Sequence, residues 1–93
     1  MSFPVLMTDG AWDDFMGLDE PTYSRAIELL ADLTQGPNAV EGARADDFGR
    51  YNIVIGDSCL VAFSLTAGER PGIADVPDGP YVHVWPPLPW IEP

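Results

Sequence analysis

Positive charge is scarce in this chain. It contains no lysine, and its only firm cations are Arg25, Arg44, Arg50 and Arg70, against fifteen aspartates and glutamates. The resulting net charge of -11 on 93 residues repels phosphate backbones and anionic lipid head groups. We therefore expect neither direct nucleic-acid binding nor attachment to a membrane surface, whereas a basic protein would be attracted. The alternative is that the acidic residues only keep a fairly apolar domain soluble or adapt it to salt.

Cysteine and histidine are nearly absent as well. Cys59 and His83 are the only residues of their types, so no disulfide can form within the chain and no Cys/His metal cluster can assemble. The paired aspartates, Asp13 with Asp14 and Asp46 with Asp47, lack the spacing of an EF-hand loop. A carboxylate-bound Ca²⁺ or Mg²⁺ stays open in principle. We predict no metal and no cofactor.

Long apolar runs and targeting signals are also missing. The first seven residues carry no positive cluster ahead of their apolar side chains, and no apolar run approaches the roughly 20 residues that cross a bilayer. The expected location is cytoplasmic. The length allows one domain with a two-layer core, and a hydrophobic content of 46% argues against disorder. We predict a single α+β domain over residues 1–93 with a proline-rich tail at 86–93.

The first part of the chain has the pattern of one strand and two helices. Residues 3–8 are apolar and predict a short strand, after which Thr8 or Asp9 can cap a short helix that ends near Gly17. A second helix starts at residues 19–21, where proline fits the first turn, and stops at Gly36 and Pro37. Its predicted apolar stripe consists of Tyr23, Ala26, Ile27, Leu30 and Leu33.

The second part has the pattern of an antiparallel meander. Residues 51–55 and 60–65 predict two strands joined by a turn at 56–59, and residues 81–85 predict a last strand. Residues 38–47 and 66–80 are expected to be loops, and the proline-rich tail is expected to run extended. The predicted fold is therefore a small antiparallel sheet with two N-terminal helices packed on one face.

The segment 49–63 resembles the hairpin of the RelE/ParE superfamily of bacterial toxins, through its tyrosine, its Gly-Asp turn and the β-α-α-β-β-β order around it. The resemblance implies a toxin that acts on translation as an mRNA endoribonuclease. This chain departs from the pattern at Asn52, Val54 and Cys59, where family members carry arginines. Arg50, Arg70 and His83 are the catalytic candidates that remain under this hypothesis. His83 points to the opposite face from Val82 and Val84, where it would act as a general acid or base, or be merely structural.

The favoured hypothesis is a non-enzymatic, acidic protein-binding module with a RelE/ParE-like fold. An inhibitor or immunity protein, or an inactive toxin homologue, would fit it, and its partner would be a basic protein. A homo-oligomer is compatible with it. The tail either covers apolar sheet surface with Trp85, Leu88 and Trp90 or presents a polyproline motif. The residues expected to contact the partner are Asp9, Asp13, Asp14, Asp19, Glu20, Asp46 and Asp47.

Overall fold

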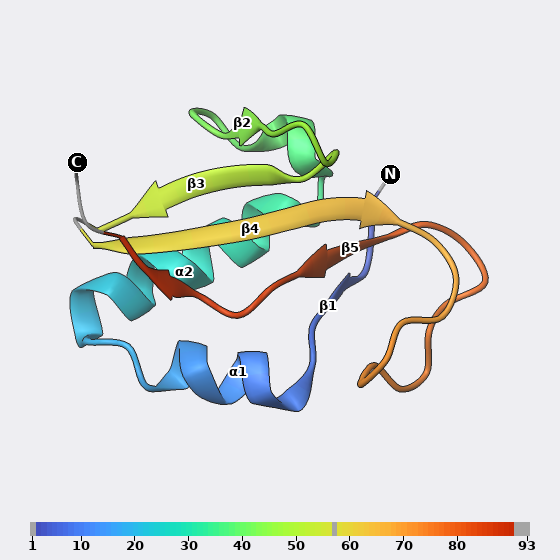
Figure 1. Ribbon diagram of the computed structural model, residues 1–93, viewed down its shortest axis with the longest axis horizontal. Coiled ribbons are helices and arrows are strands. Elements are labelled where there is room, and N and C mark those ends of the chain that lie inside the picture. The colour runs from blue at the N-terminus through green and yellow to red at the C-terminus, as the bar shows by residue number, and fades with distance from the viewer. Residues whose placement is uncertain (1, 57, 91–93) are drawn as a thin grey trace.

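The structure is a computed structural model that describes residues 2–56 and 58–90, and Figure 1 shows its elements in chain order. Asp57 of the predicted turn and residues 91–93 of the predicted tail lie outside the described part. The described elements are β1 (Val5–Leu6), α1 (Asp9–Met16), α2 (Glu20–Leu33), the 3₁₀ turn η1 (Pro37–Ala39), β2 (Arg44–Ala45), β3 (Tyr51–Ile55), β4 (Cys59–Thr66), β5 (Tyr81–Val84) and β6 (Leu88–Pro89).

Both helices begin at side chains that cap them. The Thr8 hydroxyl accepts a hydrogen bond from the Ala11 N–H at 3.1 Å, so Thr8 rather than Asp9 caps α1. The Asp19 carboxylate accepts from the Thr22 N–H at 3.4 Å and caps α2, whose first turn holds Pro21. The two predicted helices are confirmed because these local signals agree with the apolar periodicity.

The buried stripe of α2 is rotated slightly from the predicted one. Ala26, Leu29 and Leu33 are buried, whereas Ile27 is 40% exposed. Leu29 was not expected in the stripe and Ile27 was. The periodicity places an apolar stripe on a helix, but the angle at which the helix meets the sheet decides which residues at the margin of the stripe are covered.

The sheet is mixed, with the strand order β1-β5-β4-β3-β2. Three of the pairs along this path are antiparallel, but β1 runs parallel to β5, with Val5 opposite Val82. The α+β class and the helical layer are confirmed, whereas the wholly antiparallel sheet is corrected. The reason is that both helices lie between β1 and the meander, and a crossover of this length lets the last strand return beside the first in the same direction.

The core lies between the helices and one face of the sheet. Val61 and Phe63 of β4 and Val84 of β5 are 0% exposed, and they pack with Phe15 of α1 and Leu33 of α2. The helices therefore share one face of the sheet, as predicted, and α2 is seen behind the strands in Figure 1. The residues that alternate with these along β4 and β5 point to the opposite, helix-free face.

Two segments expected to be irregular contain short strands. The predicted loop at 38–47 includes η1 and also β2, which pairs with β3 through Arg44 and Asn52. The tail is extended, as predicted, and β6 pairs with the first residues of β4. Leu88 and Trp90 are 57% and 37% exposed, so each is buried only in part. Within the described ranges, no helix has the length and apolar character that a membrane crossing requires.

Two substitutions on α2 test this packing. Leu33→Ala should lower the free energy of unfolding by about 2–5 kcal/mol, because Leu33 is fully buried and its loss leaves a cavity. Ile27→Ala, on the same helix but 40% exposed, should cost much less, about 1 kcal/mol or below. Urea denaturation followed by far-UV circular dichroism measures both. Equal losses at the two positions would contradict the observed orientation of α2.

Candidate functional site: a cleft on the helix-free face of the sheet

The candidate site is built by residues of β4 and β5 that alternate with the core. Ser64 of β4 lies opposite His83 of β5, and Thr66 lies opposite Tyr81. Residues directly opposite in an antiparallel pair share a face. Trp85 extends this row, since its N–H donates to the Ala62 carbonyl at 2.9 Å. The face is therefore lined with hydroxyl and aromatic groups rather than with helix.

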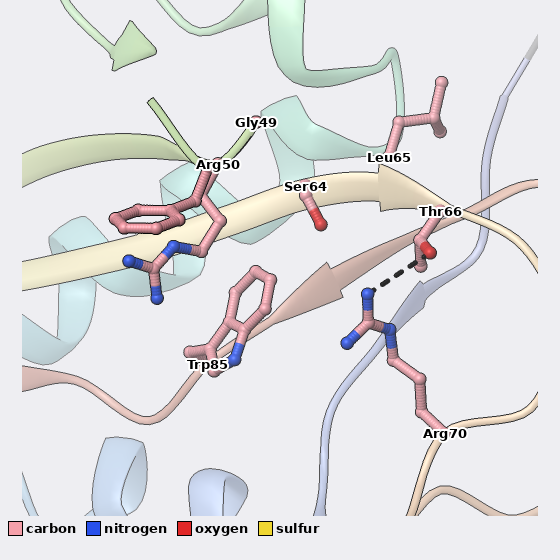
Figure 2. Close-up of a pocket in the computed structure, with 8 residues that line it drawn as sticks. Gly49, Arg50, Ser64, Leu65, Thr66, Arg70 and Trp85 are labelled. Carbon is pink, nitrogen blue, oxygen red and sulfur yellow. Dashed lines mark hydrogen bonds between the residues drawn. The ribbon is translucent and has the colours of Figure 1, made fainter. Parts of the chain in front are cut away.

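The loop at 67–80 folds over one end of this face. The Tyr81 hydroxyl donates to the Gly68 carbonyl at 2.7 Å, and Arg70 lies over the Trp85 ring. Between this loop and the turn before β3 lies a cleft of about 460 Å³. Figure 2 shows Trp85 between Arg50 and Arg70, with Ser64 and Thr66 of β4 above them in the view. The cleft is lined by Phe48, Gly49, Arg50, Ser64, Leu65, Thr66, Arg70 and Trp85.

Trp85 organises the two guanidinium groups. The guanidinium carbons of Arg50 and Arg70 each lie 5.5 Å from a Trp85 ring centroid, which is within the range of a cation–π interaction. Arg50 also lies 5.6 Å from the centroid of Phe48. The aromatic rings therefore help to place two guanidinium groups beside one cleft.

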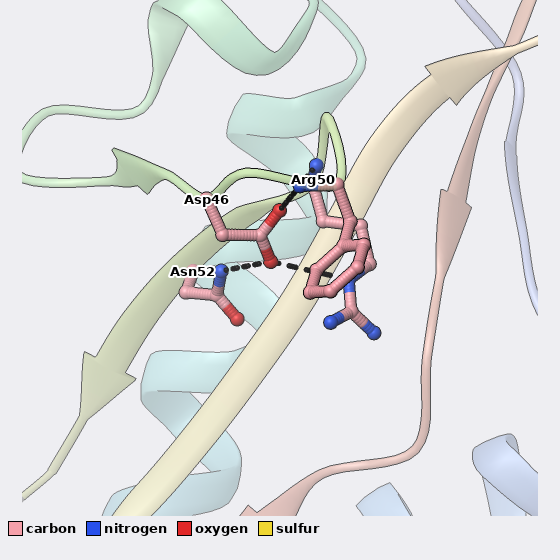
Figure 3. Close-up of polar contacts among 4 residues, drawn as sticks. Asp46, Arg50 and Asn52 are labelled. Atoms are coloured by element: carbon pink, nitrogen blue, oxygen red, sulfur yellow. Dashed lines mark hydrogen bonds and ion pairs between the residues drawn. The ribbon is translucent and has the colours of Figure 1, made fainter.

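Arg50 is held in place by Asp46 from the turn between β2 and β3, as Figure 3 shows. The Arg50 Nε donates to Asp46 Oδ2 at 3.2 Å, and the Arg50 backbone N–H donates to Asp46 Oδ1 at 3.0 Å. The Phe48 N–H and the Asn52 amide donate to the same carboxylate, at 2.8 and 3.1 Å. This arrangement uses the Nε and leaves the terminal nitrogens of Arg50 directed away from Asp46.

The hydrogen bonds to Asp46 change its acidity. Desolvation raises the pKa of Asp46, but the hydrogen bonds from Arg50, Asn52 and Phe48, together with the Arg50 charge, outweigh it and lower the pKa from 3.8 to about 2. Asp46 is therefore ionised at any physiological pH. It serves as a fixed anchor for Arg50 rather than as a free carboxylate.

Arg70 has a different environment. Its Nη2 donates to the Thr66 hydroxyl at 3.4 Å, and its Nε is buried without a hydrogen-bond partner within the described chain. The ion pairs of the described residues are Arg25 with Glu28 and Arg50 with Asp46, so Arg70 has no carboxylate partner there. An arginine with unused donors beside a cleft is suited to bind an anion.

His83 lies beneath the cleft and is 7% exposed. Its ring meets Trp85 edge-on, with 4.4 Å between centroids, and its Nδ1 is buried with no partner among the described residues. A smaller hollow of about 290 Å³ adjoins it, with Thr8 and Arg70 in the lining. Burial, and secondarily the Arg70 charge, lowers the pKa of His83 below 6.5, so the imidazole is neutral at pH 7.

The structure brings together the three residues that the sequence offers for a catalytic site. Arg50 and Arg70 lie against Trp85, and His83 lies beside it on the predicted face, although buried rather than open. Trp85 was missed as a site residue because it was expected to cover apolar surface. Ser64 and Thr66 were missed too, although their alternation with Phe63 along β4 is the signal that places them on this face.

The acidic residues predicted to bind a partner fall into two separate groups. Asp9, Asp13, Asp14, Asp19 and Glu20 are exposed on α1 and at the start of α2. Asp46 and Asp47 lie in the turn between β2 and β3, which Figure 1 shows at the other side of the sheet from α1. Asp46 and Asp47 therefore do not join the acidic residues of the two helices in one surface. Trp12 and Met16 are exposed on α1 beside the first group.

Two further features bear on the chemistry of the site. In the part of the chain that the structure describes, no three acidic, histidine or cysteine side chains gather to hold a metal ion. Cys59 is buried, and burial, followed by the Asp19 charge, raises the pKa of its thiol, so it is a poor nucleophile. The reactive groups in and beside the cleft are two guanidinium groups, two hydroxyls and a neutral imidazole.

The fold and the cleft define an α+β protein with a cationic site on the helix-free face of its sheet. Comparison with protein families, curated proteins and solved structures finds no match to this chain.

The lowered pKa of His83 predicts how stability depends on pH. Above pH 6.5 His83 is neutral in both the folded and the unfolded state. As the pH falls through 6.5, the unfolded state gains a proton that the folded state binds less readily, so the free energy of unfolding decreases. We expect the free energy of unfolding to fall from about pH 7.5 to 5.5, and to fall less in His83→Phe. Urea denaturation at both pH values measures each drop within one protein, so a general change in stability cancels. Equal decreases in the wild type and in His83→Phe would contradict the lowered pKa of His83.

Proposed function

We propose that the protein is a non-enzymatic binding module that holds one anionic group of a partner in the cleft between Arg50 and Arg70. The observation that carries this proposal is the pair of guanidinium groups set 5.5 Å from Trp85, one anchored by Asp46 and the other without a carboxylate among the described residues. A carboxylate or phosphate in the cleft would accept hydrogen bonds from the donors that Arg70 leaves unused. Ser64 and Thr66 supply hydroxyl donors on the same face.

The net charge of the protein limits which anionic ligands this cleft can bind. With -11 on the whole chain, a long polyanion would meet repulsion over most of the surface. A single carboxylate or phosphate group meets mainly the local field of the cleft, where Arg70 has no carboxylate partner among the described residues and Trp85 adds an aromatic surface. The charge therefore supports a small anionic group, presented by a protein or a small molecule, over a nucleic-acid strand.

The RelE/ParE-like fold remains part of the proposal. The order of one strand, two helices and a meander supports it, as does the packing of both helices on one face. The acidic helical surface stays a proposed contact for a basic protein, because exposed Trp12 and Met16 add apolar area beside Asp9 and Asp13. The arginine cleft and this acidic surface lie on different elements and can act independently.

Phosphodiester cleavage is the second candidate function, and the convergence of Arg50, Arg70 and His83 favours it. A neutral imidazole can accept a proton from a ribose 2′-hydroxyl, and two guanidinium groups can stabilise the charge that develops on phosphorus-bound oxygens. The burial of His83 weighs against it, because the ring has little access to a strand that lies in the cleft.

Calorimetric titration with inorganic phosphate and, separately, with succinate tests the binding proposal. We expect saturable binding of at least one anion, with a change in tryptophan fluorescence. Arg70→Gln should weaken binding about tenfold or more, since a hydrogen bond to a charged group contributes about 1.5–3 kcal/mol. Arg25→Gln changes the net charge equally but lies on α2, and should leave the affinity within about twofold. Equal losses in both variants, or no binding of either anion, would overturn the proposal.

Induction of the protein alone in a bacterium separates the two functions. A binding module predicts normal growth and intact transcripts. Growth arrest with cut transcripts, lost in His83→Ala but kept in Cys59→Ala, would establish the second function in place of the first. Cys59 is a suitable control because it is equally buried but lies on the core side of β4. RNA integrity is measured directly, so slow growth from overexpression is not mistaken for cleavage.

A further inference from the structure

The strand β3 has an edge that the rest of the described chain leaves open. β2 pairs only with Tyr51 and Asn52. If the same register continued, Gly42 would lie opposite Val54, but Gly42 has a φ of +85° and lies in a turn outside the strand. Over residues 2–56 and 58–90, no strand pairs with the second half of β3 on the side away from β4.

The backbone of Val54 faces this open edge. The Asp46 N–H donates to the Arg50 carbonyl at 2.7 Å, so the polar backbone groups of Arg50 point toward β2. Backbone groups alternate in direction along a strand, and those of Asn52 and Val54 therefore point the same way. Asn52 lies opposite Arg44 in β2, whereas Val54 has no residue opposite it on this side. Its N–H and C=O are placed to pair with an added strand.

A groove of about 600 Å³ runs along this edge between β3 and α2. Its apolar lining includes Leu29, Val40 and Ile53, and its acidic lining includes Glu28, Asp32 and Glu41. Glu28 lies 3.7 Å from Arg25, but Asp32 and Glu41 take part in no ion pair of the described residues. The groove thus combines a free strand edge, an apolar floor and uncompensated negative charge.

We propose that this groove binds an extended, basic segment of a partner protein, which adds to β3 as a further strand. Main-chain hydrogen bonds to Val54 would hold the segment. On the helical side, lysine or arginine stems would cover Leu29 and Ile53 while their charged ends reach Asp32 and Glu41. This inference is independent of the arginine cleft, which lies on the other face of the sheet.

The charge of the protein also selects against a second copy of this chain as the occupant. Pairing of two β3 edges would bring the acidic rims of both grooves together, between molecules that each carry a net charge of -11. A basic segment instead gains from the same field, both in its rate of association and in its orientation on the edge.

The test uses a capped peptide of about eight residues in which arginine alternates with threonine, a length typical of strands. Titration into the ¹⁵N-labelled protein should shift the amide signals of β3, and hydrogen exchange at the Val54 N–H should slow. A peptide with glutamate in place of arginine should not bind. A peptide with N-methyl groups on its edge-facing amides should bind about tenfold more weakly, since it loses main-chain hydrogen bonds.

The matched variants are Val54→Pro and Val54→Ala. Proline removes the edge N–H and is tolerated on edge strands, so we expect about tenfold weaker binding of the arginine peptide, whereas alanine should stay within about twofold. Anion binding in the arginine cleft should be unchanged in both. If Val54→Pro fails to fold, the N-methylated peptide still tests whether main-chain hydrogen bonds hold the segment.

Three results would overturn the inference. The first is that the wild-type protein does not bind the arginine peptide, or binds the glutamate peptide equally well. The second is that N-methylation of the peptide changes nothing, which would make the contact one of charge alone. The third is sedimentation of the free protein as a dimer with Val54 already protected from exchange, which would make a second copy the occupant.

Discussion

The alternation of side chains along β4 is the constraint on which the rest of the structure depends. Val61 and Phe63 point into the core and are fully buried, while Ser64 and Thr66 point to the other face. Since β4 pairs with β3 on one side and with β5 and β6 on the other, its register fixes the faces of its neighbours. A shift by one residue would place the hydroxyls against the helices and expose the aromatic core. The same burial that stabilises the fold therefore fixes the chemistry of the open face.

The charged residues are also divided between the two faces of the sheet. Arg50 and Arg70 flank Trp85 on the open face, and Arg44 shares this face through its pairing with Asn52. The carboxylates of α1 and α2 lie on the other side of the sheet. A strongly acidic protein can keep a local cationic site in this way, because the interaction of charges falls with distance and is screened by salt within about 10 Å. Not all carboxylates follow this division, because Asp46 is paired with Arg50 and the loop at 67–80 carries Glu69, Asp75 and Asp78.

The edges of the sheet are covered by short strands rather than by helices. The tail returns as β6 and pairs with the start of β4, where β5 has already ended, so β4 has partners near both of its ends on this side. On the opposite side β2 is only two residues long and covers part of β3. The turn at Gly42 ends that coverage, and acidic side chains border what remains open. Short edge strands and bordering charge are usual ways to limit unspecific pairing of a sheet edge, and both are found at this edge.

The sequence by itself determined the local elements and the α+β class. Both helices and the three longer strands were predictable, because caps, prolines and the 3.6- and 2-residue periods act over a few neighbouring residues. The direction of β1 beside β5, the short strands β2 and β6, and the burial of His83 were decided by tertiary structure. So was the meeting of Arg50, Arg70 and Trp85. These features join residues that are far apart in the chain, and no local preference fixes the distance or angle at which distant segments pack.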